Sequence, residues 1–416
     1  MREVTLQEVL DARDSRAAAQ QRLLSAWDRP LISFSMNIAG PVKHTPLIAL
    51  AFRAATEDLR HALGSDLLAC ETVDAATGPE ALLVCAVPAG ELKALTLRLE
   101  EERPVGRLYD LDVIGTDGSK LSRSAPRTCL VCGGPVGPCA RSRAHGLPAV
   151  QAATDALLRD FAADHLADLA VSALLEEAEL TPKPGLVDAR SSGAHRDMDL
   201  ELFRRSAACL RSYFREAVLL GLSRADCMPA LQQAGRRAEQ TMLDTTGGVN
   251  THKGAVYAFG LLLAGLGSVL ARGGDLFAAA AALAEAGLPP EDTTHGSEAK
   301  RRYGASGARG EALAGFPHAR RACGVLSGGG DLHAALLTLL AEVEDTNLLH
   351  RGGREGLLFV QNAAAEILAA PIRQRIRLLS ELDDVCIARN LSPGGCADLL
   401  AAGIFLHRSR EIWQNM

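Results

Sequence analysis

From residue 152 to the end of the chain, apolar residues recur at helical spacing in long blocks rich in Ala and Leu, and Gly and Pro separate these blocks. We find no convincing strand pattern in this half, which predicts an all-α domain. Only 4% of the residues are aromatic, and small or unbranched side chains lose little rotamer freedom in a helix. The expected helices span residues 152–179, 199–219, 228–243, 253–271, 275–286, 331–343, 356–369 and 372–388.

The first 150 residues have a different pattern. After a helical opening, short β-rich runs occur at Leu31–Ser35 and Ala81–Val87, which indicates an α+β domain. No repeat of fixed period and no low-complexity linker is found. We therefore expect an α+β domain over residues 1–150 and a larger all-α helical bundle over 151–416, joined by a nearly continuous helix near 150–160.

Charge and hydropathy exclude several classes of protein. The 44 Lys and Arg against 50 Asp and Glu give a net charge of -6, which argues against a general nucleic-acid binder. Residues 1–16 are charged throughout and lack the apolar core of a secretory signal, so we expect a cytoplasmic protein. The uncharged stretch Gly254–Ala271 contains four glycines and no aromatic belt, which favours a buried core helix over a membrane span.

Two carboxylates stand in a strand-like setting in the first half. Asp110 and Asp112 are two residues apart, and a strand would place both on one face. Two hard oxygen donors suit Mg²⁺, which can clamp a triphosphate while pyrophosphate leaves. The same Asp-x-Asp pattern also occurs in an ordinary solvent-exposed strand edge. The nearby cations that could hold phosphates are Lys43, Arg107, Arg123 and Arg127, and the alternative is a set of surface charges.

Soft metal donors follow directly. Cys129, Cys132, Cys139 and His145 include a Cys-x2-Cys pair with the spacing of structural zinc knuckles. The chain has ten cysteines and no export signal, so reduced thiols without a metal remain the alternative to one structural Zn²⁺.

Polar clusters interrupt the helical half. The loop Thr181–Asp188 contains two prolines, so it cannot be helix interior, and it presents Lys183 and Asp188. His195 and Asp197 precede a helix whose N-terminus favours anions. Two later loops offer further polar side chains, and either loop could be a capped helix end. Their candidates are Arg309 and Glu311, then Asp345, Asn347 and Arg351.

The most specific segment is Asp244–Gly254, a Gly-rich loop that leads into the uncharged helix. Backbone N–H groups at Gly247 and Gly248 could cradle a triphosphate, although the Walker spacing is absent. The hydroxyls of Thr246 and Thr251 and the ammonium of Lys253 would assist, with Asn250 as a further phosphate ligand. Glu239 precedes this segment, and His252 lies within it. A plain helix cap explains Gly248 and Asn250 but not His252 together with Lys253. By contrast, Ser392–Asp398 is predicted to be a capped helix start.

The chain resembles two known families. Its first half is similar to apo-citrate lyase phosphoribosyl-dephospho-CoA transferase, the holo-acyl-carrier-protein synthase, and its second half is similar to triphosphoribosyl-dephospho-CoA synthase. A departure is Ala39, where the first family usually has Pro. The stretches that match are Met36–Lys43, Thr77–Glu80, Gly106–Val113 and Arg127–His145 in the first half, and Pro182–Asp188, Gly193–Met198, Gly247–Gly254, Gly307–Ala312, Asp345–Gly353 and Ser392–Leu400 in the second.

The resemblance implies a bifunctional enzyme. The second half would join the ribose of ATP to the 2'-hydroxyl of 3'-dephospho-CoA and release adenine, a glycosyl transfer that needs a carboxylate and a proton donor. The carboxylate candidates are Asp197, Glu239 and Glu311, the proton-transfer candidates are His195 and His252, and the phosphate ligands are Lys183, Lys253 and Arg309.

The first half resembles a nucleotidyltransferase. It would let a Ser hydroxyl of the apo acyl-carrier subunit of citrate lyase attack the α-phosphate, with Asp110 and Asp112 holding Mg²⁺ and Lys43 and Arg107 steadying the phosphates. Three competitors stay open: the same chemistry for malonate decarboxylase, a Mg-dependent ribosyl hydrolase, and a non-enzymatic scaffold. Interaction surfaces favour aromatic anchors, which this chain largely lacks.

Overall fold

The computed structural model describes residues 2–123, 126–223, 226–287, 305 and 307–414. The chain divides into two compact units, Met1–Ala162 and Ala163–Met416. The helix α5, Leu147–Glu179, runs through this division. A continuous helix was expected near residues 150–160, and α5 occupies that stretch.

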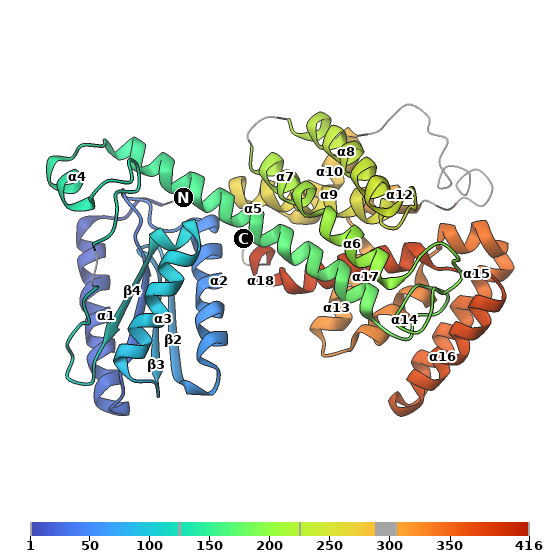
Figure 1. Ribbon diagram of the computed structural model, residues 1–416, viewed down its shortest axis with the longest axis horizontal. Helices are drawn as coiled ribbons and strands as arrows, with labels where there is room; N and C mark the ends of the chain where they lie inside the picture. The colour runs from blue at the N-terminus through green and yellow to red at the C-terminus, as the bar shows by residue number, and fades with distance from the viewer. Residues whose placement is uncertain (1, 124–125, 224–225, 288–304, 306, 415–416) are drawn as a thin grey trace. The chain divides into compact units, whose positions relative to one another are not determined.

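The first unit contains a small antiparallel sheet with strand order β2-β3-β1-β4 (Figure 1). β1 pairs with both β3 and β4, so β4 has one free edge. The β-rich runs expected near Leu31 and Ala81 are β1 and β3. The strands are β1 Leu31–Met36, β2 Leu67–Ala75, β3 Gly78–Cys85 and β4 Tyr109–Ile114, and the helices are α1 Leu6–Trp27, α2 Pro46–Leu63, α3 Ala89–Glu102 and α4 Val136–Ser142, with short 3-10 helices at Gly64–Asp66 and Pro104–Leu108.

One face of the sheet packs against α2 through aromatic rings. Phe34 of β1 is fully buried, and its ring stacks on Phe52 of α2 with centroids 4.6 Å apart. Tyr109 of β4 meets Phe34 edge to face at 5.5 Å. In-register partners of an antiparallel pair share a face, so Leu111, opposite Phe34, belongs to this face as well.

The other face packs against α1 and changes character along the strands. At one end Leu23 and Leu24 of α1 form an apolar cluster, completed by Leu31, Leu82, Val84 and Ile114 of the sheet. At the other end the register places polar residues side by side across three strands. We call this polar end the acidic patch, and it consists of Ser33, Ser35, Glu80, Asp110 and Asp112.

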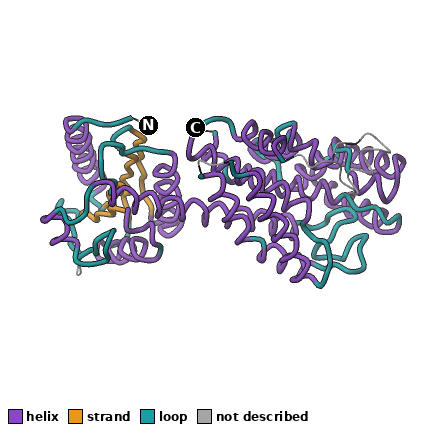
Figure 2. Tube along the Cα trace, turned by 90° about the horizontal axis from the view of Figure 1, so that it is seen from above, coloured by secondary structure: helices purple, strands orange, loops and turns teal. Residues whose placement is uncertain are grey.

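The second unit is helical, and among the described residues strands lie only in the first unit (Figure 2). The expected helix 199–219 is two helices that separate at Leu210, and two helices that were not expected form at 307–313 and 317–327. The helix start predicted at Ser392–Asp398 is the start of the helix 394–408, although the N-cap residue itself contributes no side-chain hydrogen bond. Besides the end of α5, its helices are α6 Leu200–Cys209, α7 Arg211–Leu222, α8 Met228–Thr246, α9 Lys253–Arg272, α10 Leu276–Ala286, α12 Gly307–Leu313, α13 Pro317–Ser327, α14 Leu332–Glu342, α15 Thr346–Ala369, α16 Ile372–Ala388, α17 Gly394–Arg408 and α18 Arg410–Trp413.

Helix α9 is the apolar centre of this unit. It is long and apolar enough to cross a membrane by length and composition, and 78% of its apolar window is buried inside the structure. Small residues let neighbouring backbones approach it: a Cβ at Gly267 would lie 2.4 Å from the Val218 carbonyl oxygen of α7. These contacts agree with the expected core helix.

Candidate active sites

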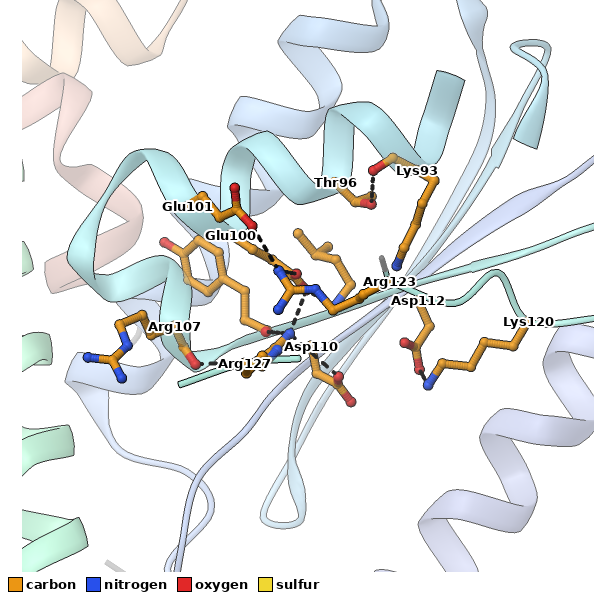
Figure 3. Close-up of polar contacts among 12 residues, drawn as sticks. Lys93, Thr96, Glu100, Glu101, Arg107, Asp110, Asp112, Lys120, Arg123 and Arg127 are labelled. Carbon is orange, nitrogen blue, oxygen red and sulfur yellow. Dashed lines mark hydrogen bonds and ion pairs between the residues drawn. The ribbon is translucent and has the colours of Figure 1, made fainter. Parts of the chain in front are cut away.

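The acidic patch of the first unit contains the predicted pair of carboxylates. Asp110 and Asp112 lie on β4 with 48% and 25% of their side chains exposed, while Tyr109, Leu111 and Val113 between and beside them are buried. Asp112 forms an ion pair with Lys120, and Asp110 lies 3.9 Å from Arg127 (Figure 3). The strand therefore presents two carboxylates on one face, within reach of a common ligand.

The free edge of β4 is capped by a buried carboxylate. Glu100 of α3, whose side chain is 3% exposed, accepts a hydrogen bond from the Leu111 N–H at 3.1 Å. Arg127 donates to Glu100 and to the Tyr109 carbonyl at 2.6 Å each, and Arg123 lies 2.9 Å from Glu100. Burial raises the pKa of Glu100, and Arg127 is the strongest influence that opposes this shift.

The other predicted phosphate ligands of this unit also have protein partners. Arg107 donates to the Thr128 carbonyl and hydroxyl and, at 2.7 Å, to the Cys129 carbonyl. Lys43 donates to the Ile38 carbonyl, and burial lowers the pKa of Lys43. Arg107 and Arg127 thus hold the segment that follows β4 against the sheet.

The predicted soft-donor set comes together. One ligand atom from each of Cys129, Cys132, Cys139 and His145 lies within 4.8 Å of all the others. The sulfurs of Cys132 and Cys139 are 3.6 Å apart, and Nε2 of His145 is buried with no hydrogen-bond partner in the described part of the chain. Backbone N–H groups of Cys132 and Val131 lower the pKa of Cys129 to about 6, which favours its thiolate.

In the second unit, the loop after α5 is built around buried charges. The Lys183 ammonium is 2.7 Å from Glu177 of α5, and these side chains are only 2% and 4% exposed. Asp188 is buried and accepts from the backbone N–H groups of Lys183, Arg190 and Ser191. Asp188 therefore stabilises the loop, and Lys183 neutralises a buried carboxylate.

His195 lies at the far end of the same loop. Its Nε2 is 2.9 Å from the Ser392 hydroxyl, and its Nδ1 is 3.3 Å from Arg351, which also donates to the Ala194 carbonyl. Burial and then Arg351 lower the pKa of His195, and Asp197, which is exposed, opposes this. His195 and Arg351, distant in sequence, thus belong to one cluster.

The Gly-rich connection ends one helix and begins the next. Gly247 is the left-handed C-cap of α8, and the Gly248 N–H donates to the Leu243 carbonyl. The Thr246 hydroxyl bonds to the Met242 and Val249 carbonyls, and Asn250 Oδ1 accepts from the Lys253 N–H. Capping therefore accounts for most of the backbone here.

His252, the residue that capping did not explain, is buried in this connection. Its Nδ1 is 2.7 Å from the Ser206 hydroxyl, which is 2.6 Å from the Thr251 hydroxyl, and its ring meets Phe203 edge to face. Burial lowers the pKa of His252 to about 3, helped by Lys183. His252 Nε2 is buried without a partner among the described residues.

Lys253, the residue after this buried histidine, is exposed. Its ammonium is 3.3 Å from Glu239 of α8, and both side chains are partly exposed. Lys253 and Glu239, two predicted site residues, are therefore direct neighbours.

Two predicted carboxylates serve helix N-termini. Glu311 accepts from the N–H groups of His318 and Ala319 at the start of α13 and lies 2.7 Å from His318 Nδ1. Asp345 is buried, and it accepts from the N–H groups of Asn347 and Leu348 at the start of α15 and of Cys396 in α17. Burial raises the pKa of Asp345, although these three bonds oppose the shift.

Two further candidates lie in helices α12 and α15. Arg309 lies near Tyr257 of α9 and opposes the burial that raises the pKa of Tyr257. Asn347 is an exposed residue of α15, and a Cβ at Gly394 would lie 2.7 Å from its side-chain nitrogen. Both positions are at the N-terminal ends of helices.

Sequence reasoning did not place Asp398 beside the Gly-rich connection. A Cβ at Gly254 would lie 1.9 Å from Asp398 Oδ2, so glycine is required where α9 meets α17. Desolvation, then Glu177 and Asp345, raise the pKa of Asp398, and a hydrogen bond from the Ala255 backbone lowers it. The spacing of Asp398 within a helix start carries no signal of this neighbourhood, because α9 is far away in sequence.

Comparison with known proteins identifies both units. Residues 163–416 match the CitG family, described as ATP:dephospho-CoA triphosphoribosyl transferase, and residues 4–161 match the CitX family, described as apo-citrate lyase phosphoribosyl-dephospho-CoA transferase. The chain belongs to both families. The protein CitXG of Haemophilus influenzae is 36% identical over 97% of this chain and 96% of its own length.

A second relative covers the CitG unit. The 2-(5''-triphosphoribosyl)-3'-dephosphocoenzyme-A synthase of Haemophilus ducreyi is 37% identical over 64% of this chain and 95% of its own length. The acidic patch and the Cys/His set lie within the CitX match, and His195, His252 and Asp398 lie within the CitG match.

Proposed function

We propose that this chain makes and attaches the prosthetic group of citrate lyase. It is a bifunctional transferase: the CitG unit converts ATP and 3'-dephospho-CoA into 2'-(5''-triphosphoribosyl)-3'-dephospho-CoA and adenine, and the CitX unit transfers the phosphoribosyl-dephospho-CoA to a Ser of the apo acyl-carrier subunit. The observation that carries this is the match of both families in one chain, together with a fused relative that aligns over 97% of it.

In the CitG unit, we assign the glycosyl transfer to the cluster around the start of α9. Departure of adenine builds positive charge on the ribose, which a carboxylate can stabilise. Glu239 is a candidate for that carboxylate because it lies beside Lys253, a cation that can hold the triphosphate. Asp197 is exposed next to His195 and is a second candidate.

Proton transfer in this unit falls to the less buried histidine. Burial keeps His252 neutral at pH 7, so it positions Ser206 and Thr251 rather than donating a proton to adenine. His195 lies between Ser392 and Arg351 and is partly exposed, which leaves it able to exchange a proton with a bound substrate. Glu311 and Asp345 hold helix N-termini and support the site indirectly.

In the CitX unit, we assign a nucleotidyltransferase-type reaction to the acidic patch. Asp110 and Asp112 offer hard carboxylate oxygens on one partly exposed face, a donor set that fits Mg²⁺. When bound there, Mg²⁺ supplies charge neutralisation for the phosphates. Asp110 and Asp112 would hold that ion, whose positive charge would let a triphosphate lie beside the two carboxylates, where the carrier Ser can attack the α-phosphorus in line.

The Cys/His set fits one structural Zn²⁺. In a tetrahedral site with Zn–S distances of about 2.3 Å, neighbouring sulfurs lie about 3.8 Å apart. The observed 3.6 Å between two sulfurs is close to that value, and the unpartnered Nε2 of His145 supplies the fourth donor. Elemental analysis should find one zinc per chain and none in Cys132→Ser; a zinc-free wild-type chain with the three thiols of this set titratable would contradict this.

The whole function is tested with the full chain, ATP, Mg²⁺, 3'-dephospho-CoA and the apo acyl-carrier subunit of citrate lyase. Mass spectrometry should show the carrier gaining the mass of the phosphoribosyl-dephospho-CoA group, and chromatography should show one adenine per carrier modified. Omission of 3'-dephospho-CoA should stop both. Adenine release without 3'-dephospho-CoA, or a carrier of unchanged mass, would reject the proposal.

A further inference from the structure

Two lysines beside Asp112 have no assigned role, and the geometry points to a shared one. We propose that Lys93 and Lys120 bind the two phosphates that leave as pyrophosphate during the transfer in the CitX unit. This inference rests on the proposed transferase function of that unit and names the residues that hold the leaving group.

Lys93 belongs to an unusual helix face. Residues 93, 96 and 100 follow one another at helical spacing, so Lys93, Thr96 and Glu100 line one side of α3. They are 8%, 0% and 5% exposed, so the buried face of α3 along β4 is polar at these positions. Glu100 accepts a hydrogen bond from the β4 edge, and the Thr96 hydroxyl donates to a carbonyl of its own helix. These bonds explain why Glu100 and Thr96 are buried.

The Lys93 ammonium is the part that remains unexplained. Its side chain extends from α3 toward β4 in Figure 3, and within the described residues it forms no hydrogen bond or ion pair. Burial lowers the pKa of Lys93, while Glu100 and Asp112 oppose this shift. An ammonium on a largely buried side chain with no direct partner can accept an anion without giving up another contact, so a ligand that supplies negative charge would stabilise it.

Lys120 approaches Asp112 from the segment that returns along β4. A turn at Gly115–Ser119, fixed by hydrogen bonds from Ser119 to Asp117, leads to a bridge between Ile114 and Lys120. The backbone of Lys120 is therefore held beside β4 while its side chain stays 60% exposed. The ammonium pairs with Asp112, and a phosphate oxygen can replace that partner.

The other nearby cations are already committed. Arg123 and Arg127 are paired with Glu100, and Arg107 bonds to the Thr128 and Cys129 carbonyls. Moving Arg123 and Arg127 would leave Glu100 buried without its partners, and moving Arg107 would release the segment that contains Thr128 and Cys129. Lys93 and Lys120, by contrast, can bind an anion without breaking a buried contact in the described part of this unit.

This placement suits the chemistry of the transfer. The bond that forms joins the carrier Ser Oγ to the α-phosphorus, and the bond that breaks joins that phosphorus to the oxygen bridging to the β-phosphate. The electron pair of the broken bond leaves with pyrophosphate, and the Ser proton passes to water. Two ammonium groups beside Asp112 would neutralise the charge that grows on the leaving group.

The test uses the full chain, purified triphosphoribosyl-dephospho-CoA, the apo carrier, Mg²⁺ and added inorganic pyrophosphate. Lys93→Met should lower kcat/KM for attachment about 100-fold and weaken inhibition by pyrophosphate at least about tenfold, and Lys120→Met should weaken it about tenfold. Arg98→Met is the matched control, because Arg98 is an exposed cation of α3 and its removal should leave both quantities unchanged.

A purely structural role for Lys93 predicts a different result. It would lower thermal stability but leave the inhibition constant for pyrophosphate unchanged. Lys93→Gln removes the charge while keeping a polar side chain if Lys93→Met does not fold, and exposed Lys120→Met should fold. Wild-type inhibition constants in Lys120→Met and in a folded Lys93 variant would overturn the inference, whereas a wild-type chain that attaches nothing would instead reject the proposed function.

Discussion

Asp110 and Asp112 of the CitX unit keep 48% and 25% of their side chains exposed, whereas Lys183 and Glu177 of the CitG unit keep only 2% and 4%. The difference follows from how each fold presents polar groups. A strand alternates its side chains, so β4 can bury Leu111 and still offer the aspartates on the other face. In the helical unit, polar loops meet helix ends, and several of their side chains satisfy backbone donors there.

The two units differ in whether a substitution at the candidate site changes the reaction or the stability of the fold. In the CitX unit Asp110 and Asp112, which are partly exposed, can be changed with little effect on the buried core. In the CitG unit Asp188, Glu311 and Asp345 are bonded to backbone N–H groups, so their removal affects the fold before it affects chemistry. The predictions below measure this contrast.

The largest stability effect is expected at the buried ion pair. Lys183→Met leaves Glu177 charged and buried, which should destabilise the CitG unit by about 3–5 kcal/mol in chemical denaturation. Adding Glu177→Leu should recover much of the loss. Lys120→Met, which removes a partly exposed pair in the CitX unit, should cost at most about 1 kcal/mol. Equal losses from the two single variants would break the comparison.

A smaller loss is expected when the shared helix cap is removed. Asp345→Ala frees the N–H groups of two helix starts, so the unfolding free energy should fall by about 2–3 kcal/mol. Asp331→Ala removes one exposed cap, at Ala334 of α14, and should cost about 1 kcal/mol. If Asp345→Ala costs no more than Asp331→Ala, the bond from Asp345 to Cys396 contributes nothing.

The pH dependence should reveal the buried His252. Its folded pKa of about 3 lies below the ordinary 6.5, so the unfolded chain binds more protons between these values. The contribution of neutral His252 to the free energy of unfolding is therefore fully present above about pH 6.5. It is lost as the pH falls toward 3, and the loss amounts to about 2 kcal/mol at pH 5. His252→Gln should flatten the unfolding free energy between pH 7 and 5; an unchanged slope would mean that His252 is not held neutral.

The sequence predicted part of the CitX unit correctly. What it could not predict depends on how the strands and helices pack against one another. The alternation around Leu111 and the β-rich run at Leu31 predict strands with Asp110 and Asp112 on one face, and the structure has both strands. Their neighbour Glu80 depends on the register of β1 with β3 and β4, which no local pattern encodes. Lys93 was overlooked because a single lysine in an amphipathic helix resembles a solvated one.

In the CitG unit, the helical periodicity of the sequence predicted most of the helices but not which side chains contact one another. The expected helix at 253–271 is α9. The break at Leu210 between α6 and α7 was not predicted, because the sequence has no Gly or Pro there. The Gly247–Gly248 pair fits a phosphate cradle and a helix C-cap equally well by composition. Contacts such as Asp398 with Gly254 arise only when distant helices pack.

The central claim, that each unit performs its own reaction, is tested most directly by Asp112→Asn in the full chain supplied with ATP, Mg²⁺, 3'-dephospho-CoA and the apo carrier. We predict that adenine release stays at the wild-type rate while the carrier gains no mass. Loss of adenine release together with attachment, or attachment at the wild-type rate, would contradict the account.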